Sequence, residues 1–399
     1  MKIIKWDRHD KLNQKVFDEA RILILWNKYL MSTLGLWPNN KSDLIFVSLF
    51  CYLCYAFILN YIALYYALKS LNLVNIIGTT VESITLLQIC IRLYTMRRYN
   101  KYYGTLLNQF LLDFSIKNYK NDEERSMFLS YNVRSKFFIK IGVVSIVLTA
   151  MLYFTKPLIR QLHFTKNFNS TVTINYDLPY RIHILYKVTN IKRYIITYIS
   201  QIPLLFIIIF TQTSMDCLTL SIILHLCGQL GVLSIRINNL NVMNEMKEFR
   251  QIIQRHQELI IIGLKLKAVY RLCLFVHFIG ASVGICILIY QVQLNVSYGQ
   301  MTNLLTFFGY GFLNTFRLYT HCWVGEYLIH ESVNISNAFY QCQWYDLPIK
   351  DQKSIIFCIT CSQQPLSLVA GSFGDFSFTM FTNIMKSAMA YLSFLRNFI

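Results

Sequence analysis

Seven apolar segments, each about as long as a membrane is thick, dominate this sequence. About 20 apolar residues in a helix cross the hydrocarbon core, where every backbone polar group must be satisfied within the protein. The pattern therefore predicts an all-α membrane protein with seven transmembrane helices. One of the segments is longer than a single crossing needs and contains Pro203, so we expect it to kink or to continue into the cytosol. The segments cover residues 44–68, 71–94, 137–155, 194–225, 272–294, 300–325 and 375–397.

Composition and charge support this class. Hydrophobic residues make up 55% of the chain and charged residues 15%, against about 25% charged in soluble domains. The net charge of +18 is spread through the loops without a compact basic domain, which argues against a nucleic-acid partner. Most Lys and Arg residues lie in the first segment and in alternate loops, and positive residues stay on the cytoplasmic side. The N-terminus is therefore predicted to be cytoplasmic and the C-terminus extracellular.

This topology divides the chain into four parts. Residues 1–42 form a cytoplasmic segment with an interfacial amphipathic helix and no recognisable secretory leader. Residues 43–325 hold six transmembrane helices, cytoplasmic loops and an extracellular loop at 156–193. Residues 326–364 form a cytosolic helical assembly segment, and 365–399 hold the seventh transmembrane helix, in contact with lipid and lining a path. Of the glycosylation motifs, those at Asn169 and Asn295 are external in this topology.

Enzymatic chemistry finds no support in the sequence. There is no zinc-protease, nucleophile-elbow, phosphate-loop or dinucleotide-binding motif, so we expect no enzyme, cofactor or metal. Most of the eleven cysteines fall in apolar runs, where thiols behave as small hydrophobes. The two CxxC spacings, which begin at Cys51 and Cys358, lack the further ligands that zinc requires. His277, alone on an apolar helix, is interpreted as a core histidine with satisfied hydrogen bonds.

Four of the charged residues within or near the spans are singled out, because each needs a partner or water there. Glu82 borders a binding cavity or makes a structural hydrogen bond, and the second interpretation is favoured. Asp216 and Arg317 are predicted to form an ion pair between helices. Lys386 has three interpretations, as a cation in a permeation path, a snorkelling side chain or a subunit contact, of which the subunit contact is favoured.

Other classes of membrane protein fit less well. A receptor coupled to a G protein has the opposite topology, and the Asp-Arg-Tyr and Asn-Pro-x-x-Tyr motifs of that class are absent. A transporter favours internal repeats or helices broken at mid-membrane, and the sequence shows neither apart from Pro203.

The C-terminal third resembles insect odorant receptors. The resemblance rests on the order and spacing of HCWVGEYLIHES (321–332), SNAFY (336–340), WYDLP (344–348), QQPLSLVAG (363–371) and a K-S-x-x-x-Y pattern that ends at Tyr391. Residues 214–237, 255–266 and 276–290 resemble the family's fourth and fifth helices. The short loop before the fifth span resembles that of ligand-tuned members and differs from the long loop of the coreceptor. Gustatory receptors usually end in Thr-Tyr followed by Gln-Phe, where this chain has Ala390-Tyr391 and Asn397-Phe398.

The resemblance implies a function. The chain is expected to be a subunit of a ligand-gated, non-selective cation channel, a heterotetramer with the odorant receptor coreceptor in the plasma membrane of sensory dendrites. A gustatory-type channel and a G-protein-coupled receptor are the alternatives. The resemblance places Phe394 and Phe398 at an apolar gate lined by the last helix. It implies a pocket for a small volatile apolar ligand in the outer half of the bundle, with Glu82, Ser83, Val147, Met151, Phe206, Phe307 and Tyr310 as candidates.

Overall fold

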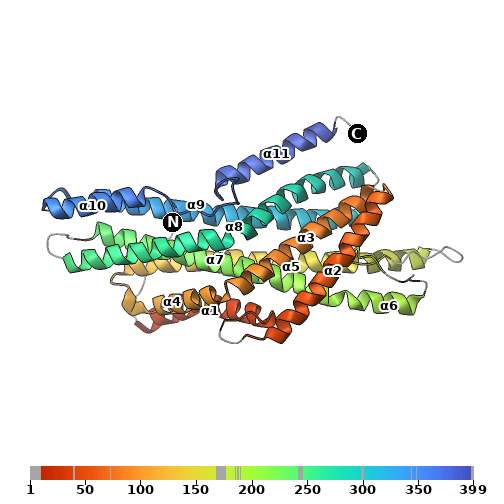
Figure 1. Cartoon of the computed structure of the whole chain (residues 1–399), viewed down its shortest axis with the longest axis horizontal. Helices are drawn as coiled ribbons and strands as arrows, with labels where there is room; N and C mark the ends of the chain where they lie inside the picture. The colour runs from red at the N-terminus through yellow and green to blue at the C-terminus, as the bar shows by residue number, and fades with distance from the viewer. Residues whose placement is uncertain are drawn as a thin grey trace.

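A computed structural model of the chain consists of long helices that run side by side (Figure 1). Among the described residues the only β-structure is an isolated bridge between Val369 and Asp375. The predicted all-α fold is confirmed. The structure describes residues 10–38, 41–71, 73–167, 177–184, 186, 188, 190–240, 246–297, 301–342, 344–346 and 348–396.

Each predicted span coincides with a helix or a pair of helices. Five helical stretches within the described ranges are long and apolar enough to cross a membrane. They correspond to the first five predicted spans, and two further helices cover the sixth and seventh. The spans lie in α2 (Asp43–Lys69), α3 (Leu73–Arg98), α5 (Asp122–Asn167), α6 (Ile191–Ser200) with α7 (Ile202–Asn238), α8 (Met246–Ser297), α9 (Met301–Gln341) and α11 (Phe378–Arg396). The remaining elements are α1 (Asp10–Thr33), α4 (Asn100–Asp113), α10 (Ile349–Ser362) and the short 3₁₀ helices η1 (Ile116–Asn118) and η2 (Trp344–Asp346).

The fourth predicted span is interrupted at Gln201. Helix α6 ends at Ser200, α7 begins at Ile202, and Pro203 lies in the first turn of α7. Proline is tolerated in a first turn because the backbone N–H that it lacks would have no partner within the helix. The kink expected from Pro203 is therefore present as a junction between two helices.

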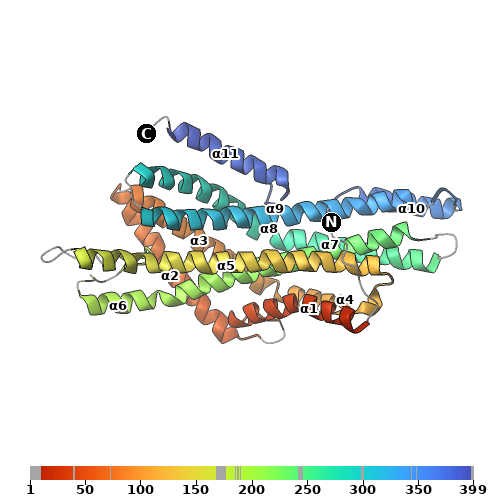
Figure 2. The same cartoon turned by 180° about the vertical axis from the view of Figure 1, so that it is seen from behind.

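Helix α7 forms the centre of the bundle. Most of its side chains are buried, and its closest neighbours are α5 and α9. Figures 1 and 2 show α7 running through the middle of the elongated molecule. Gly228 and Gly231 lie against Phe128 and Met127 of α5, so the absence of a side chain lets the two helices approach closely. Helix α7 therefore forms the centre of the core.

Several helices continue well beyond the apolar spans that predicted them. Helix α8 has 52 residues and is therefore about 78 Å long at 1.5 Å per residue. Helix α9 continues without a break to Gln341, so the predicted assembly segment from residue 326 begins inside that helix. Hydropathy detects the apolar part of a helix, whereas its polar continuation looks like a loop.

Helix α11 diverges from the bundle, as Figure 1 shows. Its base is attached to α9. Phe376 is fully buried, its carbonyl lies directly against Gly325, and the backbone N–H of Phe378 donates to the Glu326 carboxylate at 3.0 Å. A carboxylate at the first turn also favours the helix electrostatically. The start of α11 is therefore fixed to one point on α9.

Candidate functional site

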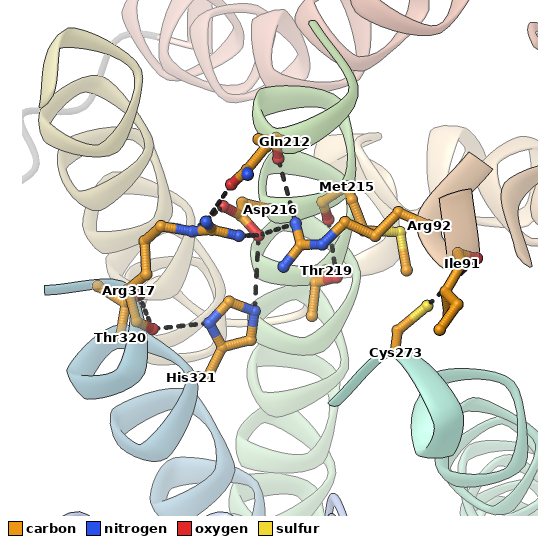
Figure 3. Close-up of polar contacts among 10 residues, drawn as sticks. All are labelled: Ile91, Arg92, Gln212, Met215, Asp216, Thr219, Cys273, Arg317, Thr320 and His321. Atoms are coloured by element: carbon orange, nitrogen blue, oxygen red, sulfur yellow. Dashed lines mark hydrogen bonds and ion pairs between the residues drawn. The ribbon is translucent and has the colours of Figure 1, made fainter. Parts of the chain in front are cut away.

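A buried cluster of charges lies where α3, α7 and α9 meet (Figure 3). Asp216 of α7 accepts a hydrogen bond from Arg92 Nη1 at 2.8 Å and another from Arg317 Nε, also at 2.8 Å. The side chains are 13%, 3% and 4% exposed, respectively. Two arginines thus share one carboxylate in the interior, where charges need partners.

Neighbours one helical turn away complete this cluster. Gln212, four residues before Asp216, accepts from Arg317 through its side chain and from Arg92 through its carbonyl. His321, four residues after Arg317, pairs its Nδ1 with the Arg317 carbonyl at 2.7 Å and has Nε2 3.8 Å from Asp216 Oδ1. Residues four apart share a helix face, so both pairs point toward the same place. The polar contacts therefore tie three helices together.

The sequence interpretation found two members of the cluster and missed the third. The structure brings the predicted partners Asp216 and Arg317 together. Arg92 lies within the predicted span 71–94 but was not among the charges expected to need a partner; α3 continues to Arg98, and Arg92 is buried within the bundle. Its signal was its position between Ile91 and Leu93, since a charge in an apolar helical run requires a partner.

Helix α8 contributes His277 and Cys273 beside the cluster. The His277 ring is 1% exposed and its centroid lies 4.9 Å from that of His321. Neither ring nitrogen has a hydrogen-bond partner among the described residues, so the predicted satisfied histidine is buried but unpaired. Cys273 donates to Thr95 at 3.1 Å, which joins α8 to α3.

A cavity of about 20 Å³ adjoins the charges between α5, α7 and α9. Its polar lining includes Thr213, Asp216, Arg317 and Thr320, and the other lining residues are mainly apolar. The hydroxyl of Thr213 is buried and has no hydrogen-bond partner among the described residues. A space of this size suits one water molecule and is too small for an organic ligand.

A second buried cluster surrounds Glu82 on α3. One carboxylate oxygen accepts from Tyr153 Oη at 2.5 Å, and the other accepts from the backbone N–H of Arg181 at 2.7 Å and from Asn60 Nδ2 at 3.3 Å. The Ser83 hydroxyl donates to Asn60 Oδ1 at 2.6 Å. These are the contacts expected if Glu82 makes structural hydrogen bonds, the interpretation favoured from the sequence.

The other candidate pocket residues separate into two groups. Ser83, Val147 and Tyr310 are half-buried, and Tyr310 lies beside Gly284 of α8. Met151 is 43% exposed and Phe206 is 50% exposed, so these two side chains lie on the outer surface of the bundle, contrary to a place in its interior. A position in the outer half of a helix does not determine which face of the helix a side chain occupies. Phe307 belongs to α9, but its side chain is outside the described part.

The remaining predicted positions lie at the periphery. Lys386 is exposed on α11, and Phe394 belongs to the same helix, although its side chain is not described. Phe398 and Asn169 lie outside the described residues. Asn295 falls in the last turn of α8 and not in a loop, because that helix extends to Ser297. No group of three or more metal-binding side chains occurs in the part of the chain that the structure describes.

Comparison with known proteins gives a consistent picture. A family model described as the 7tm odorant receptor matches residues 72–389. Odorant receptor 13a of Drosophila melanogaster is 23% identical over 95% of this chain and 88% of its own. The odorant receptor coreceptor of Aedes aegypti is 26% identical over 35% of this chain and 29% of its own.

The fold also matches solved structures. The structure of olfactory receptor OR5 from Machilis hrabei in complex with eugenol superposes with a TM-score of 0.81 at 15% identity, covering 96% of this chain and 100% of that one. The structure of the same receptor that is described without eugenol gives a TM-score of 0.78 at 14% identity, over 95% of this chain and 98% of that one. The family model covers most of the seven-helix bundle and the polar clusters that join it, and on this basis the chain belongs to the seven-transmembrane odorant receptor family.

Proposed function

We propose that this odorant receptor is the ligand-tuned subunit of a heterotetrameric channel that it forms with the odorant receptor coreceptor. Binding of a small volatile apolar ligand in the outer half of the bundle opens a non-selective cation pore lined by α11. Family membership and the likeness to a receptor solved with eugenol support this function. The proposed location is the plasma membrane of a sensory dendrite, with the N-terminus in the cytosol.

One observation carries the mechanism. Helix α9 bears Tyr310 near one end, Arg317 in the buried charge cluster, and Gly325 and Glu326 at the base of α11. A ligand that displaces α9 at Tyr310 therefore also moves the point to which α11 is attached. Because packed helices move as units, a shift at one site reaches the other.

The proposed pocket lies among the half-buried candidates Ser83, Val147 and Tyr310. An apolar wall with a few hydroxyl groups suits a small neutral ligand, and it discriminates analogues by about 1 to 3 kcal/mol per methylene. Phe394 and Phe398 remain the proposed gate, and Lys386, exposed on α11, remains a proposed subunit contact.

Tyr310 offers a test of the pocket. Tyr310→Ala should raise the half-maximal ligand concentration about tenfold, because removing a large aromatic contact costs about 1.4 kcal/mol or more. Dose–response curves for several active volatiles would measure the shift. Met151→Ala is the matched control, since its side chain is 43% exposed and should leave the curves unchanged. Equal behaviour of the two variants would contradict the placement.

The channel function has a direct test. Cells that express this chain with the coreceptor are tested with a broad panel of volatiles while G-protein signalling is blocked. At least one volatile should evoke a cation current. Current that disappears under the block would favour the metabotropic alternative. Current evoked by non-volatile tastants, and by no volatile in the panel, would favour the gustatory-type channel.

A further inference from the structure

Residues 177–184, the longest described part of the connection between α5 and α6, are bound to the end of the bundle. Gln201, fully buried at the junction of α6 and α7, accepts from the backbone N–H of Tyr180 at 2.9 Å and donates to the Tyr180 carbonyl at 3.3 Å. Tyr194 donates to the Asp177 carbonyl at 3.0 Å, and the His183 N–H donates to the carbonyl of Leu59 at 3.1 Å. The segment thus makes backbone contacts with α2, α6 and the helix junction.

Glu82 binds Arg181, the residue after Tyr180 in the same segment. Its carboxylate accepts from the Arg181 N–H at 2.7 Å, and Asn60, which bonds the same carboxylate, also donates to the Arg181 carbonyl at 3.1 Å. The Arg181 guanidinium lies over Gly78 on α3, where no side chain stands in its way. The backbone of residues 180–181 is therefore bonded from both sides.

The buried carboxylate of Glu82 depends on donors from several elements. Glu82 is 7% exposed, and its donors come from α2, α5 and the connection, three separate elements. A buried carboxylate without these donors would be costly, so the connection and the carboxylate stabilise each other. The ring of Tyr180 packs against Tyr153, the donor from α5, at 5.8 Å between centroids.

We propose that Glu82 is a positioning residue that fixes residues 177–184 as a wall across this end of the bundle, and so sets how fast ligands exchange. The kinetic part rests on the proposed function, which places the ligand site among the neighbouring parts of α3, α5 and α9. Ser83, adjacent to Glu82, bonds the same Asn60, so the wall and the pocket share one hydrogen-bond network. Glu82 acts through the connection and does not contact the ligand.

Cysteine labelling tests the wall without any current. The variant Ile182→Cys carries a cysteine in the connection. Intact cells that express this variant and the coreceptor are treated with a membrane-impermeant thiol reagent. Adding Glu82→Gln should speed its modification about tenfold, because losing a charged hydrogen bond costs about 1.5 kcal/mol or more. The parent chain without Ile182→Cys corrects for labelling of the native cysteines.

Glu331→Gln is the matched control. Glu331 is 3% exposed and accepts from Tyr131 of α5 at 2.6 Å, the same chemistry as Glu82 and Tyr153. It should leave the labelling rate of Ile182→Cys unchanged. Tyr153→Phe removes one hydrogen-bond donor and keeps the carboxylate. Its labelling rate should lie between those of the chain with Ile182→Cys alone and of the Glu82→Gln variant. It serves as the test if Glu82→Gln fails to reach the surface.

A second readout follows current after ligand washout. Faster decay in Glu82→Gln, at equal surface abundance and equal maximal current, is the expected result. An unchanged labelling rate in both Glu82→Gln and Tyr153→Phe would overturn the wall. Faster labelling without ligand-evoked current in the parent receptor would leave the wall standing and count against the proposed channel function alone.

Discussion

Asp216→Asn should remove most of this receptor from the cell surface. The substitution leaves Arg92 and Arg317 buried at 3% and 4% exposure without their shared counter-charge. Breaking a buried ion pair by removing one partner costs about 3 to 5 kcal/mol, a large part of the stability of most domains. Surface biotinylation and the thermal stability of the detergent-solubilised receptor would measure the effect.

An exposed pair provides the control for Asp216. Asp43 binds Arg97 at 2.5 Å, and these side chains are 71% and 32% exposed. Asp43→Asn should therefore change stability by less than about 1 kcal/mol, because exposed ion pairs contribute little. Equal surface abundance of the two variants would contradict the importance assigned to Asp216.

Apolar replacement of the whole cluster gives a second check on the cause. Arg92→Met, Asp216→Leu and Arg317→Met together remove all three charges, and buried charges replaced by apolar groups are often tolerated. This triple variant should regain part of the surface abundance that Asp216→Asn loses. Exchanging Asp216 and Arg317 should not restore it, because the new arginine at position 216 would face Arg92.

Gly325→Ala should abolish most ligand-evoked current. A Cβ at this position would lie 2.1 Å from the carbonyl oxygen of Phe376, a backbone atom that cannot rotate away. The segment before α11 must therefore move, which also weakens the bond from the Phe378 N–H to Glu326. Overpacking of this kind costs about 1 to 3 kcal/mol, and displacing α11, the proposed pore helix, should lower current per surface receptor at least about tenfold.

Gly142→Ala on α5 is the control for Gly325→Ala, because it adds the same methyl group to a helix where the structure has room for it. The nearest atom to a Cβ there is on Phe316 at 3.9 Å, an ordinary contact, and alanine favours a helix more than glycine does. Its current and surface abundance should match the parent. Normal current in Gly325→Ala would show that α11 is not held against α9 as the structure indicates.

Local patterns were sufficient to predict the membrane-spanning helices, although α4 falls between two predicted spans and was not predicted as a helix. Each predicted span overlaps an observed helix, and Pro203 marked the junction of α6 and α7. These features depend on neighbouring residues along the chain, since a run of apolar residues and a missing N–H act within one helix. Helices α8 and α9 extend beyond the predicted spans because a helix continues past the apolar run that reveals it.

Side-chain partners were harder to predict. Asp216 and Arg317 could be paired because both are charges in apolar helices with opposite signs. Glu82 was recognised as a residue that needs a partner, but no pattern near it indicates the backbone of Arg181, 99 residues away. Met151 and Phe206 were selected for a pocket inside the bundle, and the structure leaves both side chains exposed.

The sequence alone determined the class of this protein and its membrane-spanning helices, because hydropathy is a property of short segments, and its ordered motifs carried the family resemblance. Only the tertiary structure decided that Arg92 shares Asp216, that Glu82 holds the connection before α6, and that Gly325 seats the base of α11. These contacts join residues 51 to 124 positions apart. Their geometry depends on how whole helices rotate and pack against one another, which no local pattern encodes.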